Sequence, residues 1–214
     1  MAYSKQSTDR FLLLYRELEK IRDTEPAIYD YYEKKDARSF DLYRRLRNQL
    51  SHIAVHGEYP FIVSDALVNE LEELIREMGL SAFEIANKTI NYATEKTSLG
   101  AMAKYLGESG HTYLPIYDSA KRIIGVATSQ SLLALTQLGV SMEEEAEKHL
   151  SRFHLANQKT RFSFFAREDP AYLVEQDFAL VKDGKRLGIG FVTEHGNPSE
   201  AILGLVTVYD VLKK

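Results

Sequence analysis

The chain contains no cysteine among its 214 residues. Disulfide bonds, zinc sites with cysteine ligands and thiol nucleophiles are therefore excluded. It also has no apolar run close to the roughly 20 residues that a membrane-spanning helix needs. Residues 1–6 lack the apolar core of a signal peptide. These absences predict a cytoplasmic protein that does not enter a membrane.

Acidic residues slightly outnumber basic residues. The chain has 27 Lys and Arg against 31 Asp and Glu, for a net charge of −4. This balance argues against broad electrostatic binding to nucleic acid, although it leaves room for a local basic patch. The histidines show no metal-ligand spacing, so no metal site is predicted. The signature of a phosphate-binding loop is also absent. With 44% hydrophobic residues, the chain can bury a core, and its length predicts one or two domains.

The first part of the chain, residues 1–80, has the periodicity of helices. Apolar residues recur there at i, i+3, i+4 and i+7 in three stripes, each of which predicts an amphipathic helix. The stripes are Phe11, Leu14, Tyr15, Leu18 and Ile21; Phe40, Tyr43, Leu46, Leu50 and Ile53; and Val68, Leu71, Leu74, Ile75 and Met78. We expect the second helix to end near residues 56–57, and the third to have Ser64 as N-cap and Gly79 as C′ residue. Residues 24–35 predict a loop, with a short helix as the alternative.

From about residue 81 onward, short strands alternate with helices and a repeat becomes visible. Residues 110–118 (Gly-His-Thr-Tyr-Leu-Pro-Ile-Tyr-Asp) lead into Ile-Ile-Gly-Val-Ala-Thr-Ser-Gln-Ser at 123–131. Residues 187–193 lead into Ile-Leu-Gly-Leu-Val-Thr-Val-Tyr-Asp at 202–210. The pattern is that of a β-α-β-β-α unit used twice, so the fold class is α+β. Duplicated units often carry ligands in the clefts between the copies.

The remaining elements of the two copies follow from local patterns. We expect a strand at 89–93, a helix at 98–106, a charged connecting helix at 140–152, a strand at 161–165 and a helix at 170–181.

Residues 81–214 resemble a tandem pair of CBS domains, with repeat 1 at 81–140 and a connecting helix and repeat 2 at 141–214. The resemblance rests on residues 110–118 and on the two Gly-x-x-Thr segments. In that family two copies pack sheet against sheet and leave two clefts for adenine-containing ligands such as AMP, ATP, S-adenosylmethionine and cyclic di-AMP. The resemblance therefore implies an adenine nucleotide as regulatory ligand, with no cofactor required.

The same resemblance implies the contact residues. In the family, the Thr hydroxyl and the Asp carboxylate of Gly-x-x-Thr-x-x-Asp hold the ribose hydroxyls. Thr207 and Asp210 match this pattern fully, whereas Thr128 is followed by Ser131 at the position of the Asp. The second cleft is therefore the better candidate. The alternative is that Asp210 only caps the last helix and Thr207 only ends a strand.

Residues 1–80 carry a second resemblance, to HEPN domains, through Arg47-Asn48-Gln49-Leu50-Ser51-His52. In active members two subunits join to cut RNA without a metal, with Arg47 contacting the phosphate and His52 acting on the 2′-hydroxyl or the leaving oxygen. Asn48 and His52 are four residues apart on a helix, so Asn48 can orient the imidazole. Other members have lost activity and serve dimerisation. Residues 1–80 hold 12 Lys and Arg against 15 Asp and Glu, which does not favour RNA.

Three hypotheses follow. The preferred one is a regulatory CBS-domain protein that binds an adenine nucleotide and signals through its helical part or a protein partner. We expect a homodimer, with the helical part contributing much of the contact. The alternative is an enzyme, a nucleotide-regulated and metal-independent ribonuclease that uses Arg47, Asn48 and His52. The third is a purely structural dimer without a ligand.

Overall fold

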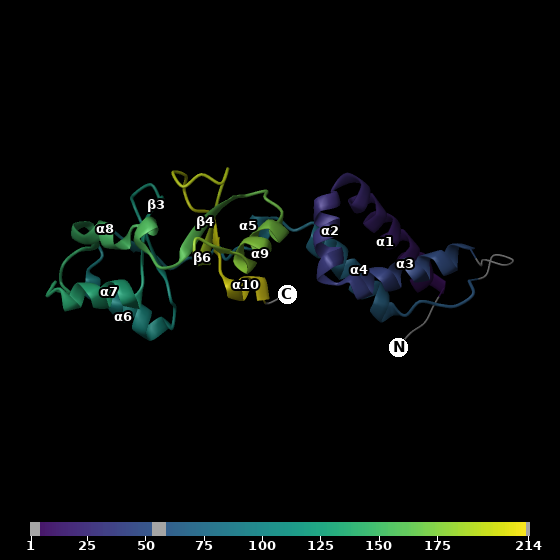
Figure 1. The fold of residues 1–214 in the computed structure, drawn as a ribbon, viewed down its shortest axis with the longest axis horizontal. Coiled ribbons are helices and arrows are strands. Elements are labelled where there is room, and N and C mark those ends of the chain that lie inside the picture. The colour runs from purple at the N-terminus through teal and green to yellow at the C-terminus, as the bar shows by residue number, and fades with distance from the viewer. Residues whose placement is uncertain (1–4, 53–58, 213–214) are drawn as a thin grey trace. The chain divides into compact units, whose positions relative to one another are not determined.

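The computed structural model describes residues 5–52 and 59–212, except for the side chain of residue 52. The chain divides into two compact units (Figure 1). The first comprises Met1–Leu80 with Pro170–Tyr172, and the second comprises Ser81–Asp169 with Leu173–Lys214. Among the helices of the described residues, none combines the length and the apolar character needed to cross a membrane.

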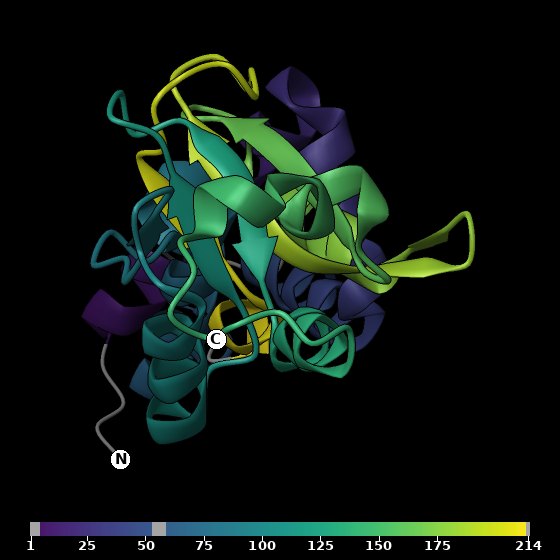
Figure 2. The same cartoon turned by 90° about the vertical axis from the view of Figure 1, so that its left-hand side faces the viewer.

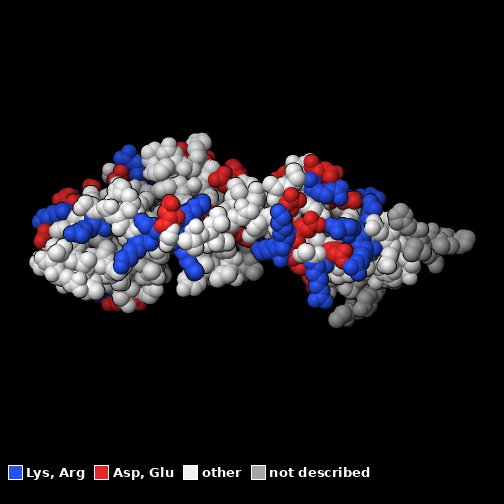
Figure 3. All heavy atoms as spheres, viewed as in Figure 1, with Lys and Arg blue, Asp and Glu red and all other residues white. Residues whose placement is uncertain are grey.

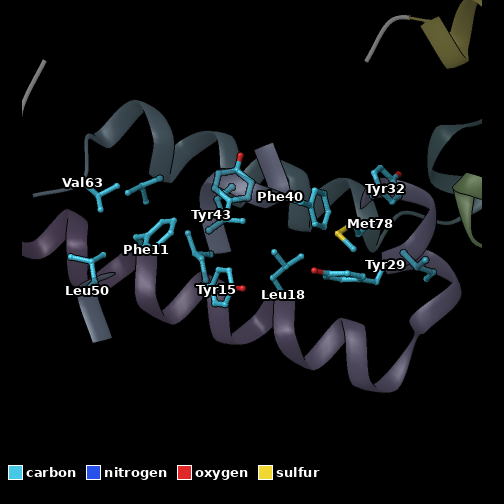
Figure 4. Packing of buried hydrophobic residues seen from close by; sticks show 14 residues of the cluster. Phe11, Tyr15, Leu18, Tyr29, Tyr32, Phe40, Tyr43, Leu50, Val63 and Met78 are labelled. Atoms are coloured by element: carbon cyan, nitrogen blue, oxygen red, sulfur yellow. The ribbon is translucent and has the colours of Figure 1, made fainter. Parts of the chain in front are cut away.

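The first unit is a helical bundle. Its helices are α1 (Lys5–Thr24), α2 (Pro26–Lys35), α3 (Ala37–His52) and α4 (Asp65–Met78). All three predicted stripes point into one core, in which aromatic rings from different helices meet (Figure 4). Phe11 of α1, for example, lies 6.4 Å from Tyr43 of α3, measured between ring centroids. The predicted helices are thus confirmed, whereas Ile53 and the expected helix end at 56–57 lie outside the described residues.

Two details of this unit correct the sequence predictions. Residues 24–35 form the short helix given as the alternative rather than a loop. Pro26 occupies the first turn of α2, where its missing N–H is not needed, and Tyr29 and Tyr32 are buried. Ser64 is the N-cap of α4 as predicted, and its hydroxyl accepts the Leu67 N–H at 3.3 Å. Gly79 is the C-cap of α4 rather than the C′ residue that we expected, and its φ of −86° is right-handed.

The chain after Leu80 contains two successive β-α-β-β-α repeats, which lie in the second unit except for the first two residues of α9. The first consists of β1 (Ala93–Thr94), α6 (Leu99–Ser109), β2 (Leu114–Tyr117), β3 (Ile123–Ala127) and α7 (Ser129–Gln137). The second consists of β4 (Arg161–Ala166), α9 (Ala171–Ala179), β6 (Lys185–Thr193), β7 (Gly204–Val206) and α10 (Val208–Leu212). In each repeat the first strand pairs parallel with the second, and the second pairs antiparallel with the third. The predicted order of elements is confirmed.

One short hairpin was not predicted. Strand β5 (Val181–Lys182) turns back at Asp183 and Gly184 and pairs antiparallel with the start of β6. Both turn residues have positive φ, 51° and 71°, which glycine adopts freely and aspartate more readily than most residues. The hairpin is yellow-green in Figure 2 and projects beyond its sheet.

The expected connecting helix at 140–152 is wrong. The Leu99 and Gly100 amides donate hydrogen bonds to the carbonyl oxygens of Glu144 and Met142, at 2.9 and 2.7 Å. The Ala146 amide in turn donates to Thr97. Because this backbone pairs with the start of α6, it does not continue as one helix. In place of the expected helix, the connection between α7 and β4 contains three short helical turns: η1 (Ala146–His149), α8 (Leu150–Phe153) and η2 (Leu155–Asn157).

Each repeat supplies a segment that packs on the sheet of the other. Helix α5 (Ala82–Ile85) precedes the first repeat but packs against β4 and β7 of the second. Asn87 and Leu205 then exchange two backbone hydrogen bonds of 2.8 and 3.0 Å. The chain reaches its own sheet only after this point. The strand expected at 89–93 is therefore found at Ala93–Thr94, and only Ala93 was predicted correctly. In the same way α8 precedes the second repeat and packs on β3 of the first, where Phe153 is fully buried.

Both crossing segments lie over a glycine of the Gly-x-x-Thr motif. A Cβ added to Gly125 would lie 2.8 Å from Cβ of Phe153, and one added to Gly204 would lie 2.8 Å from Cβ of Ala86. Real Cβ atoms do not approach other atoms so closely, so only glycine permits these contacts.

An ion-pair network around the buried Asp177 joins elements of the second repeat. The Asp177 carboxylate accepts hydrogen bonds from Arg161 at 2.7 Å, from Lys182 at 2.6 Å and from the Ser163 hydroxyl at 2.5 Å. Burial alone would raise the pKa of Asp177, but the bonds from Arg161, Lys182 and Ser163 outweigh it and lower the pKa to about 2. The network joins β4, α9 and β5, and sequence patterns did not reveal it.

We expect Gly125→Ala to destabilise the second unit by roughly 1–3 kcal/mol, because the new methyl group overlaps Phe153. Gly107→Ala is the matched control. A Cβ at Gly107 meets no atom within 4 Å in α6, so alanine should be neutral or stabilise by up to about 1 kcal/mol. Denaturant unfolding measures both, and equal stability of the two variants would refute the close contact.

The Asp177 network should also make stability depend on acid. The folded-state pKa of Asp177 lies below its unfolded value, so the network stabilises fully above about pH 4–5 and is lost as pH falls toward 2. The difference of roughly two pKa units is worth about 2–3 kcal/mol. Asp177→Asn should therefore lower the unfolding free energy at pH 7 and flatten its fall between pH 5 and pH 2. Asp183→Asn, in the exposed turn of the β5–β6 hairpin, should leave the profile unchanged, and a wild-type profile in the Asp177 variant would contradict the assignment.

Candidate functional site

The motif threonine of the second repeat stands at the start of the last helix. Thr207 follows β7 directly, and Asp210 lies in the first turn of α10. One carboxylate oxygen of Asp210 accepts both the Thr207 N–H at 2.8 Å and the Thr207 hydroxyl at 2.7 Å. The structure therefore brings the two predicted residues together, and it also shows the capping arrangement that the sequence left open as an alternative.

The first repeat has the same arrangement with a shorter side chain. Thr128 is the N-cap of α7, and its hydroxyl accepts the Ser131 N–H at 3.1 Å. The Ser131 hydroxyl oxygen accepts the Thr128 N–H at 2.9 Å, as the Asp210 carboxylate does for Thr207. Serine thus replaces the capping function of aspartate but brings no charge.

A cavity of about 630 Å³ opens at Thr128 and Ser131. Its volume lies within the range of pockets that hold small ligands, roughly 300–1,000 Å³. One wall is the first turn of α7, and the other is the segment that leads into the second repeat. The lining residues are Thr128, Gln130, Ser131, Ala134, Ser151, Arg152, Asn157, Gln158 and Lys159. The sequence favoured the second cleft, yet this cavity lies at the first.

The wall formed by residues 151–159 is fixed by its own side chains. The Gln158 amide donates to the carbonyl oxygen of Arg152 at 2.9 Å, and the Asn157 amide donates to that of Ser151 at 2.7 Å. Gln158 is 7% exposed, so this polar side chain is built into the wall. The neighbouring Phe153 anchors the segment on Gly125.

Sequence reasoning missed Arg152 and Lys159, the two cations that line the cavity. A signal was present, because residues 149–167 contain no Asp or Glu in a chain that is acidic overall. On the face drawn in Figure 3, basic side chains lie along the part of this unit between α7 and α8. Nothing in the spacing of these residues, however, indicated that they would face the same cavity as Thr128.

The residues of the HEPN resemblance lie on α3 of the first unit. Arg47 pairs with Glu19 at 3.4 Å, lies over the ring of Tyr15, and donates to the Asn48 side-chain oxygen at 3.2 Å. That oxygen of Asn48 is therefore engaged by Arg47. The side chain of His52 lies outside the described part of the structure, so its predicted contact with Asn48 stays a prediction.

Metal ligation has no evident place in the described residues. Within them, no group of three or more His, Asp or Glu side chains is arranged to hold a metal ion.

Comparison with protein families gives one match. The sequence model of the CBS domain matches residues 82–136. The matched stretch runs from α5 into α7 and includes Gly125, Thr128 and Ser131. A CBS domain is therefore found at the first repeat. No curated protein matches the chain.

Several solved structures are similar to this chain. A conserved protein domain of unknown function from Neisseria meningitidis has 17% identity and a TM-score of 0.48, over 82% of this chain and 99% of that chain. A CBS domain protein from Pyrobaculum aerophilum complexed with AMP has 11% identity and a TM-score of 0.46, over 63% and 92%. A CBS domain pair in complex with 5′-methylthioadenosine and S-adenosyl-L-methionine has 18% identity and a TM-score of 0.43, over 63% and 94%. At these values the likenesses assign no ligand or residue role to this chain.

We expect the capping role of Asp210 to be measurable without any ligand. Asp210→Ala removes the acceptor of two hydrogen bonds and should lower the unfolding free energy by roughly 1 kcal/mol, within a usual range of about 0.5–2 kcal/mol. Asp210→Ser copies the first repeat and should recover most of this loss. Thermal unfolding of the three proteins tests the prediction, and equal melting temperatures for all three would contradict it.

Proposed function

We propose that the second unit is a regulatory module that binds an adenine nucleotide, and that the cleft at Thr128 is its principal ligand site. The observation that carries this proposal is the cavity at Thr128 and Ser131, which lies at the motif residues of the matched CBS domain. In the family that the sequence resembles, this position holds the ribose of an adenine-containing ligand. In the structure the Thr128 hydroxyl donates to the Ser131 hydroxyl at 3.3 Å, and the Ser131 hydroxyl donates to the Thr128 carbonyl oxygen at 2.9 Å. Because a hydroxyl can both donate and accept, a ribose would exchange these local bonds for bonds of its own.

The second cleft is part of the same proposal. Thr207 and Asp210 keep the full family pattern, and the carboxylate can accept from both ribose hydroxyls. Because one Asp210 oxygen already accepts two bonds from Thr207, a ribose there would depend mainly on the other oxygen. We therefore assign Thr207 and Asp210 to a second ligand site, subordinate to the first.

The helical unit is proposed to carry the signal. A homodimer formed through this unit, a protein partner and a cytoplasmic location all stay predictions from the sequence. Cyclic di-AMP remains one member of the ligand class, beside AMP, ATP and S-adenosylmethionine.

The ribonuclease alternative has less support. Arg47 pairs with Glu19 in the described structure, although a nuclease would need it for phosphate. A cavity between α3 and α4 is lined by the carboxylates of Asp36, Glu70, Glu73 and Glu77, and the bundle surface mixes acidic with basic side chains (Figure 3). Carboxylates repel an RNA backbone.

The proposal is tested by binding measurements on the whole chain. Adenosine, AMP, ADP, ATP, S-adenosylmethionine and cyclic di-AMP are screened by thermal shift, because a ligand that binds only the native state raises the melting temperature. Calorimetry then measures the ligands that shift it. Thr128→Val removes a hydrogen-bonding hydroxyl and should weaken the best ligand by roughly threefold to tenfold, as loss of about 1 kcal/mol implies.

Two further variants separate the clefts. Asp210→Ala should weaken only a second, weaker binding event, by about one to two decades for a lost bond to a charged group. Ala134→Ser, a small change in the same cavity wall, serves as a conservative control. If no member of the panel binds, the proposed function fails. If Asp210→Ala abolishes the tighter event and Thr128→Val does not, the order of the two sites is reversed.

A further inference from the structure

The cavity at Thr128 differs in charge from the other two cavities described in the chain. Its lining holds two cations, Arg152 and Lys159, and no carboxylate. A cavity of about 410 Å³ in the helical unit has Arg10 beside Asp65, and the one between α3 and α4 has four carboxylates. The positive cavity is therefore a local feature of an acidic chain.

The two cations are also left without ionic partners. Within the described part of the chain, neither Arg152 nor Lys159 forms a salt bridge with a carboxylate. Most other basic residues of the same unit do so, namely Lys96, Lys104, Arg122, Lys148, Arg161, Arg167 and Lys182. The positive charges of Arg152 and Lys159 are not neutralised by a carboxylate of the described chain, so they remain available to an anionic ligand.

The surrounding structure fixes the backbone that carries these exposed cations at the cavity. Arg152 precedes Phe153, which is locked over Gly125, and the Arg152 carbonyl is held by the buried Gln158 side chain. Lys159 follows Gln158 directly, and the Gln158 carbonyl accepts a bond from Lys185 of the β5–β6 hairpin at 2.8 Å. Both charged residues thus stand on a wall that is tied to β3 on one side and to β6 on the other. A fixed wall loses less entropy on binding than a free loop.

The opposite wall adds to the same potential. It is the N-terminal turn of α7, a helix of 9 residues with Thr128 as N-cap. Helix N-termini carry partial positive charge and attract anions. Ser131 stands where the family has a carboxylate, so no negative side chain opposes an anion at this turn.

From these observations we infer that the first cleft recognises its ligand mainly through a chain of phosphates, and that it binds nucleoside di- and triphosphates in preference to monophosphates and nucleosides. The inference rests on the proposed function for the adenosine part of the ligand. Arg152 offers a planar guanidinium that can hold two phosphate oxygens, and Lys159 offers a separate point charge. Two cations at different positions of the wall suit more than one phosphate group.

Calorimetry with adenosine, AMP, ADP and ATP, in EDTA and without divalent cations, tests the inference on the full chain. We expect affinity to rise by about threefold to tenfold with each added phosphate, since partly exposed charge-assisted bonds are screened by solvent and salt. Inorganic tripolyphosphate should compete with ATP. Raising the salt from 50 to 200 mM should weaken ATP more than adenosine.

Charge-matched variants locate the effect. Arg152→Gln and Lys159→Gln should each lower ATP affinity about tenfold and adenosine affinity less than twofold. Arg186→Gln and Lys104→Gln remove exposed cations that do not line the cavity, and they should leave every affinity within twofold. Melting temperatures of the free variants show whether each protein is folded.

The outcomes separate this inference from the proposed function. Equal affinity for adenosine and ATP, or unchanged ATP affinity in both cavity variants, would overturn the phosphate inference and leave adenine-nucleotide binding intact. Binding of tripolyphosphate with no binding of any adenine compound would overturn the proposed function and the nucleotide part of the inference. Absence of all binding would overturn both.

Discussion

The second unit depends on one steric constraint, the absence of a side chain at Gly125 and Gly204. Each glycine lies in the hairpin strand of one repeat and lets a residue of the crossing segment come within a distance that a Cβ would forbid. At Gly125 that residue is Phe153, and at Gly204 it is Ala86. Because the crossing segments precede the opposite repeats, these two contacts join both sheets into one unit. A repeat alone would leave its sheet uncovered at this point, so the two copies depend on each other for burial.

The same constraint explains why the Gly-x-x-Thr motif has both a folding and a binding side. Three residues after the glycine, Thr128 or Thr207 follows the strand and begins a helix. Three residues further on, the side chain of Ser131 or Asp210 accepts a hydrogen bond from the backbone N–H of that threonine and so caps the helix. The capping bonds would exist without any ligand. The cavity, by contrast, depends on the glycine, because the segment that packs over Gly125 also forms the second wall of the cavity. A motif that is local in sequence thus acquires its cleft from residues about 25 positions further along the chain.

This origin also determines how much could be predicted from the sequence. Period-3.6 stripes placed the bundle helices, and the repeat placed the strands, because those signals are local. The segment at 140–152 was misjudged because its charged residues suit a helix, whereas its backbone is engaged by Leu99 and Gly100. The motif residues Thr128, Ser131, Thr207 and Asp210 could be named, but their cavity partners could not. Arg152 and Lys159 line the same cavity as Thr128 because tertiary contacts such as that of Phe153 place their segment there, and no periodicity encodes these contacts.

The two repeats differ in charge at the residue that follows the motif threonine by three positions. Asp210 brings a carboxylate to the start of α10, while Ser131 performs the same capping at the start of α7 without charge. In the first repeat the crossing segment supplies cations and no carboxylate. In the second, the crossing segment has Lys88, which donates to the backbone oxygen of Glu84 and lies over the ring of Phe83. One copy therefore combines neutral hydroxyls with available positive charge, and the other combines a carboxylate with a cation that is already engaged. The proposed phosphate ligand of the first cleft and the proposed ribose contact at Asp210 both rest on this difference in charge between the repeats.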